Sequence, residues 1–126
     1  MRFTLKKEER LYGYATLENV YVNGKHFSTD SIKIIFLEIP KSNFPTGRVV
    51  FSVPKKSFKR AVDRNLLKRR MREIYRNHKH LLYKELEEKE KNIHMYIIYL
   101  AKEILSFNEL KENILKALKI LVNKLN

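Results

Sequence analysis

The stretch RAVDRNLLKRRMREIYR, residues 60–76, holds seven basic residues and only two acidic ones. On a helix, at about 100° per residue, six of its polar side chains fall within an arc of roughly 140°. These residues, named the cationic arc below, are Arg64, Asn65, Lys68, Arg69, Arg72 and Arg76. Leu67, Met71, Ile74 and His78 recur at helical spacing on a separate side. The stretch therefore predicts a helix with one side in the core and a cationic side facing solvent or a partner.

The cationic arc indicates a nucleic-acid-binding surface. Asp63 and Glu73 are expected to project to other sides, so that neighbouring cations repel with no acid to offset them. Such a surface is costly alone and becomes favourable against phosphates. Arginine suits this task because its planar group grips phosphate oxygens and stacks on bases. The alternative is an ordinary solvated face, and for Asn65 a hydrogen bond at the helix end.

The composition points the same way. The chain has 126 residues, 27 basic and 14 acidic, and a net charge of +13, which favours a polyanionic partner. We expect one RNA-binding domain over residues 1–126. Without cysteine there are no disulfides, thiol chemistry or cysteine-based zinc sites. No metal site is predicted, because no ligand spacing links the four histidines, His26, His78, His80 and His94.

Hydrophobic periodicity predicts three helices and a small sheet. The expected elements are a helix at 14–23, a strand at 32–39 with a possible partner at 26–29, a strand at 48–53, the basic helix at 60–78, a strand at 94–100 and a helix after Ser106. Residues 80–92 read as a further short helix or an extension of the basic helix. In the last helix an apolar stripe should lie on the sheet, formed by Phe107, Leu110, Ile114, Leu118, Leu121 and Leu125. The fold class is an α/β (α+β) sandwich, a mixed sheet of about four strands covered by helices.

The segment AVDRNLLKRRMREIYR resembles the arginine-asparagine-rich signature of the bacterial ribonuclease P protein subunit. In that family an Arg-Asn pair is followed after two residues by Lys-Arg, and after two more by Arg-Glu. Those positions are here Arg64 with Asn65, Lys68 with Arg69, and Arg72 with Glu73. The strand RVVFSVPKK and the opening LKKEERL are also similar to the family, so the resemblance covers nearly the whole chain.

The resemblance implies that the signature helix docks on a catalytic RNA subunit. Leu66 stands where the family commonly has a third consecutive basic residue, so one phosphate contact is expected to be missing. Lys59 and Arg60 are candidates to supply that charge. The basic residues expected to join the cationic arc in binding RNA are Lys55, Lys56, Lys59 and Arg60.

The resemblance also implies a cleft, between the first helix and the sheet, for the single-stranded 5′ leader of precursor tRNA. Unpaired bases gain by stacking on aromatic rings, and the candidates on adjoining elements are Tyr21, Phe36 and Phe51. The alternative for Phe36 and Phe51 is the hydrophobic core, which is favoured for both. Leu17 lies where the family often has an aromatic residue, which leaves Tyr21 as the better platform.

The expected function is that of the protein subunit of a ribonucleoprotein endonuclease that trims precursor tRNA. The resemblance implies that the catalytic centre and its Mg²⁺ ions belong to the RNA. Consistent with this, the sequence shows no nucleophile motif or paired carboxylates. The family also implies an unusual left-handed crossover through the basic helix, whereas nearly all such connections are right-handed.

The expected partners are the catalytic RNA and precursor tRNA, with no membrane and no obligate protein partner. We expect a cytoplasmic location, since neither a membrane-spanning run nor a signal peptide is evident. The alternatives are an RNA-binding protein of ribosomal type without a processing role, and a DNA-binding regulator, which would normally need a helix-turn-helix partner.

Overall fold

The computed structural model describes residues 9–41 and 47–125, which form three helices and four strands. In chain order they are α1 (Tyr14–Asn23), β1 (Lys25–Ser28), β2 (Ile32–Pro40), β3 (Gly47–Ser52), α2 (Ala61–Glu88), β4 (Lys91–Tyr99) and α3 (Phe107–Lys124). The predicted elements are confirmed, and the predicted ends differ by at most a few residues except in the basic helix. None of the helices in these ranges is long and apolar enough to pass through a membrane.

The four strands form one mixed sheet in the order β1-β2-β4-β3. The pairings of β2 with β1 and with β4 are antiparallel. The β3 and β4 strands pair in parallel, with Val49 opposite Met95, and α2 connects them as predicted. The mixed sheet is therefore confirmed, while the left-handed sense of the crossover stays a prediction.

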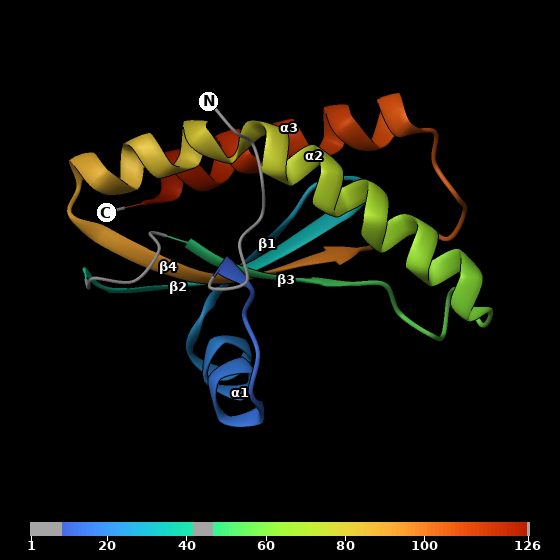
Figure 1. The fold of residues 1–126 in the computed structure, drawn as a ribbon, viewed down its shortest axis with the longest axis horizontal. Coiled ribbons are helices and arrows are strands. Elements are labelled where there is room, and N and C mark those ends of the chain that lie inside the picture. The colour runs from blue at the N-terminus through green and yellow to red at the C-terminus, as the bar shows by residue number, and fades with distance from the viewer. Residues whose placement is uncertain (1–8, 42–46, 126) are drawn as a thin grey trace.

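Helices cover both faces of the sheet: α2 and α3 lie on one face and α1 lies on the other (Figure 1). Strand residues alternate between these faces. Met95 and Ile97 of β4 belong to the large core beneath α2 and α3. On the other face, Ile35 packs with Val20 of α1 and with Leu11 of the N-terminal segment.

The basic helix is longer than the predicted range, because residues 80–88 continue it as α2 without a break. Of the two alternatives for this stretch, the extension is thus confirmed. Leu67, Met71 and Ile74 are buried as predicted, so the orientation of α2 is set by the same apolar spacing that the sequence displays. His78, expected on that side, is only half-buried.

The two other helices end or begin where the sequence indicates. Gly24 follows α1, and its N–H donates to the Val20 carbonyl at 2.8 Å. A Cβ atom there would lie 2.4 Å from that oxygen, so only glycine fits. At α3 the Ser106 hydroxyl accepts from the Glu109 N–H at 3.2 Å, as the capping spacing predicts.

The apolar stripe of α3 is buried from Leu110 onward, but Phe107 is 40% exposed. The expectation that Phe107 packs on the sheet was wrong. Phe107 is the first residue of the helix, and the first turn of a helix has no preceding turn to shield it.

Candidate nucleic-acid interface

The cationic arc lies along one side of α2, with side chains that are exposed or half-buried. The side chains of Lys68, Arg69 and Arg72 make no hydrogen bond or ion pair with any residue in the described ranges, and the same is true of the Asn65 side chain. Their charges are therefore not offset by local contacts. Four neighbouring polar groups in this state can donate hydrogen bonds to phosphate oxygens or base edges without first breaking a protein contact.

Arg64 belongs to the same side of the helix but has a structural task. One of its terminal nitrogens donates to the Phe58 carbonyl at 2.7 Å and to the Lys59 carbonyl at 2.8 Å. These bonds fasten the segment that precedes α2 to the first turn of the helix. Arg64 thus positions the residues next to it as well as adding charge.

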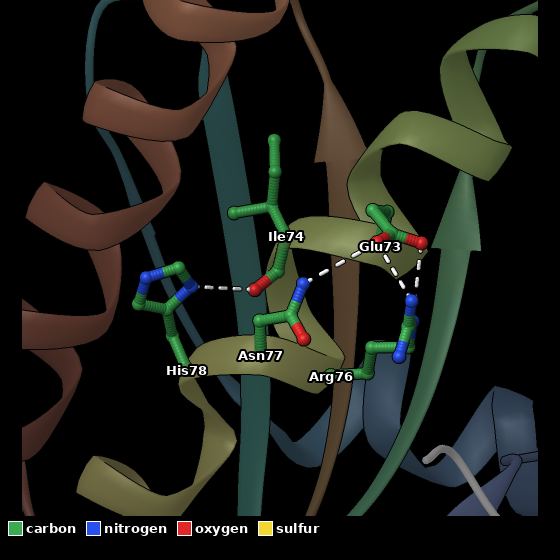
Figure 2. A network of polar contacts seen from close by, with 5 residues as sticks. All are labelled: Glu73, Ile74, Arg76, Asn77 and His78. Carbon is green, nitrogen blue, oxygen red and sulfur yellow. Dashed lines mark hydrogen bonds and ion pairs between the residues drawn. The ribbon is translucent and has the colours of Figure 1, made fainter. Parts of the chain in front are cut away.

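Arg76 is the member of the arc whose charge is already paired. Its guanidinium forms an ion pair with Glu73 at 2.7 Å and a second hydrogen bond at 3.1 Å (Figure 2). The hydrogen bond from Arg76 is the largest cause that lowers the pKa of Glu73. The expectation that Glu73 points away from the arc was wrong, because residues three apart on a helix are neighbours.

The same close-up explains His78. Its Nδ1 lies 2.8 Å from the Ile74 carbonyl (Figure 2), and since a carbonyl can only accept, this ring nitrogen carries the proton. His78 therefore bonds to the preceding turn of its own helix. This contact gives His78 a structural role within α2.

Basic residues continue the surface upstream of α2. The loop between β3 and α2 exposes four of them, Lys55, Lys56, Lys59 and Arg60. The loop is held from beneath by Phe58, which is 7% exposed and packs against the Tyr99 ring with centroids 5.6 Å apart. The buried ring and the Arg64 bonds together give these four side chains a defined base next to the cationic arc.

Aromatic side chains gather on the face of the sheet that carries α1. Tyr21 is 56% exposed, and its ring meets Tyr96 of β4 edge-on with centroids 6.4 Å apart. His26 of β1 packs against Tyr21 with centroids 5.8 Å apart. The Tyr96 hydroxyl donates to the Leu17 carbonyl at 3.5 Å. The structure therefore brings Tyr21 and Leu17 together, and adds two aromatic rings to them.

Sequence reasoning missed Tyr96 and His26 as members of this cluster. The signal for Tyr96 was present in the alternation of β4, because Met95 and Ile97 face the main core and the residue between them must face α1. Partial burial, followed by the neighbouring Tyr21, raises the pKa of Tyr96. Its hydroxyl is therefore a neutral hydrogen-bond donor at neutral pH.

Phe36 and Phe51 do not belong to this cluster, so they are wrong as candidates for the leader cleft, and the favoured alternative, the core, is confirmed. Phe36 is 1% exposed and Phe51 is 7% exposed, and both lie in the core beneath α2 and α3. The Phe51 ring packs edge-on against Tyr75 of α2, with centroids 5.7 Å apart. The period of two along a strand explains this placement, since Ile35 beside Phe36 already faces α1.

Arg48 and His94 lie beside each other on neighbouring strands, at the same level of β3 and β4. Burial, and then the positive charge of Arg48, lower the pKa of His94. His94 is therefore neutral at pH 7, and Arg48 supplies the positive charge at this position. The described ranges contain no group of three His, Cys, Asp or Glu side chains that could hold a metal ion.

Comparison with known proteins identifies relatives over almost the full length. A family model described as "Ribonuclease P" matches residues 5–125. The "Ribonuclease P protein component" of Porphyromonas gingivalis is 32% identical over 116 residues, which cover 92% of this chain and 85% of that protein. The protein of the same name from Chlorobium phaeobacteroides is 34% identical over 121 residues, with coverage of 88% and 83%.

Two solved structures have a similar fold. The RNase P protein from Thermotoga maritima superimposes with a TM-score of 0.70 at 26% identity, covering 89% of this chain and 96% of that one. A Staphylococcus aureus RNase P protein gives a TM-score of 0.69 at 21% identity, with coverage of 90% and 94%. At 21% identity, the similarity to the Staphylococcus aureus protein shows the fold alone.

Proposed function

This chain belongs to the ribonuclease P protein family, and we propose that its cationic arc docks on the catalytic RNA subunit while the Tyr21 surface binds the 5′ leader of precursor tRNA. The family assigns it the role of the protein subunit of an endoribonuclease, ribonuclease P. We also propose that it acts in the cytoplasm, together with its RNA partner.

The docking proposal is carried by one observation, the unpaired charges of Lys68, Arg69 and Arg72 on a single side of α2. Binding to phosphates releases condensed counterions and relieves the repulsion among these side chains. The loop that precedes α2 extends the same surface with four exposed cations. Asn65, exposed next to them, can donate and accept hydrogen bonds at a base edge or a 2′-hydroxyl.

For the chemical step, we propose that the RNA subunit holds the Mg²⁺ ions and activates the attacking water. The described residues offer no cluster of metal ligands, so we assign the protein no part in magnesium coordination. Its contribution is electrostatic: cations between two polyanions lower their mutual repulsion and allow substrate and ribozyme to approach.

The experiment that tests this function measures cleavage of precursor tRNA by a bacterial ribonuclease P RNA as Mg²⁺ is varied. We expect the purified protein to lower the Mg²⁺ concentration needed for half-maximal cleavage, because its cations replace part of the screening by the metal. An unchanged requirement, with RNA binding intact, would favour the alternative of an RNA-binding protein of ribosomal type.

The leader proposal rests on the exposed ring of Tyr21 and on its contacts with Tyr96 and His26. Replacing Tyr21 with Ala should weaken holoenzyme binding of precursor tRNA roughly tenfold, since stacking of one base is worth about 1–3 kcal/mol. Affinity for mature tRNA, which lacks the leader, should not change. The measurement is a pair of binding titrations with the two tRNA forms.

Two control variants separate stacking from general damage to α1. Tyr21→Phe keeps the ring and should retain most of the affinity for precursor tRNA. Tyr14→Ala removes an 83% exposed ring from the same helix and should have no effect. Equal losses for precursor and mature tRNA in Tyr21→Ala would contradict a leader-binding role.

A further inference from the structure

A pocket of about 550 Å³ lies where the N-terminal segment, the outer edge of β3 and the cationic side of α2 meet. Its walls include Arg10 and Tyr12 from the N-terminal segment, Val50 and Phe51 from β3, and Lys68 and Arg72 from α2. Two of these residues belong to the cationic arc. Arg10 and Tyr12 lie outside the arc, on the N-terminal segment.

The N-terminal wall of this pocket is fixed in place from both sides of Arg10. Before it, Glu9 is 3% exposed and its carboxylate lies 2.7 Å from the Lys79 ammonium group. The Tyr83 hydroxyl also bonds to this carboxylate. After it, Leu11 is 4% exposed, and its N–H donates to the Val49 carbonyl at 2.9 Å. Arg10 is thus held opposite α2 by two buried neighbours.

The pocket also exposes backbone groups of β3. This strand is at the edge of the sheet. Among the described residues, a single bridge, between Arg10 and Val49, joins it to the N-terminal segment. The Val49 carbonyl points outward to Leu11, and because strand residues alternate, the peptide groups of Phe51 face outward as well. An N–H and a C=O are therefore presented at the pocket wall beside apolar side chains.

These groups match the parts of a nucleotide. Arg10, Lys68 and Arg72 place three positive charges around one opening, which suits a phosphate. Tyr12 is 69% exposed and offers a ring on which a base can stack. The backbone N–H and C=O of an edge strand can bond to the polar edge of that base. The volume lies in the range of ligand pockets, on the order of 300–1,000 Å³.

We propose that this pocket holds one unpaired nucleotide of the catalytic RNA subunit, with its phosphate among Arg10, Lys68 and Arg72 and its base on Tyr12. The inference rests on the proposed docking of the cationic arc, because Lys68 and Arg72 serve both. Continuity with that arc assigns the nucleotide to the RNA subunit. The leader surface lies around Tyr21, on the face that carries α1.

The test compares the affinities of full-length variants for a bacterial ribonuclease P RNA transcript at fixed salt. Tyr12→Ala should raise the Kd roughly tenfold through loss of stacking, while Tyr12→Phe should bind like the unchanged protein. Tyr14→Ala is the matched control, since Tyr14 is equally aromatic, 83% exposed, and outside the pocket. Arg10→Ala should lower the salt dependence of binding by about one phosphate contact, and Lys102→Ala, at an exposed position away from the pocket, should not.

A Kd for Tyr12→Ala equal to that of Tyr14→Ala would overturn the proposal. A loss seen only for precursor tRNA would also overturn it, by assigning the pocket to the leader. If the pocket variants keep their RNA affinity but change the self-association of the protein, the β3 edge binds protein and the proposal is wrong. If the unchanged protein fails to bind the transcript at all, the docking function itself is wrong.

Discussion

Replacing Lys68, Arg69 and Arg72 together with Ala is expected to weaken binding to the catalytic RNA roughly 10²-fold at about 0.15 M salt. Each cation that neutralises a phosphate releases about one condensed counterion, so three lost contacts also lower the slope of log affinity against log salt by about three. Affinity titrations over a series of salt concentrations measure both quantities. These three residues are chosen because none has a partner in the described ranges.

Arg64 and Arg76 are left unchanged, because Arg64 holds the preceding loop and Arg76 is paired with Glu73. The control variant replaces Lys102, Lys116 and Lys119, which are exposed on α3 and the loop before it, and removes the same net charge. If both triple variants lose the same affinity and slope, binding depends on overall charge, and α2 is not the docking surface.

Replacing Glu9 with Ala is expected to lower the free energy of unfolding by about 3–5 kcal/mol, because it leaves a charge buried without its partner. The Lys79 side chain is only 12% exposed, and the Glu9 side chain only 4%. The total free energy of unfolding of a small domain is about 5–15 kcal/mol, so the expected loss is a large part of it. Urea unfolding followed by circular dichroism, with linear extrapolation, gives the value.

A second replacement tests whether the buried charge is the cause. Adding Lys79→Met to Glu9→Ala should restore much of the lost stability, since neither charge is then left unpaired. Glu73→Ala serves as the surface control. It breaks an ion pair within α2 whose two side chains are 33% and 43% exposed, and it should change the stability very little. If the double variant is no more stable than Glu9→Ala, the loss comes from packing and not from the unpaired charge.

The fold was predictable where short-range patterns determine it. Pro40 and Gly24 mark the ends of β2 and α1, and the capping pair at Ser106 marks the start of α3, because turn and cap chemistry is local. The apolar spacing of α2 likewise predicted its buried side. The resemblance of residues 61–76 to a family signature then supplied what these patterns lack, which is the function.

The site was predictable only in part, because its remaining features depend on contacts between distant segments. The two hydrogen bonds from Arg64 to the carbonyls of Phe58 and Lys59 require a particular path of the loop. The buried pair of Glu9 with Lys79 joins residues 70 positions apart. Phe36 and Phe51 were candidates for the cleft as well as for the core, because alternation shows which residues of a strand share a face but not which face carries α1.

The order of the strands in the sheet affects how the chain must fold during synthesis. The β1 and β2 strands form a hairpin from neighbouring residues, whereas the sheet partner of β3 is β4, the next-to-last of the described elements. Until β4 leaves the ribosome, the apolar sides of β2 and β3 have no strand between them to join. Pairing over such sequence separations closes large loops and is slow, so the nascent chain carries exposed apolar strands until β4 has been synthesised.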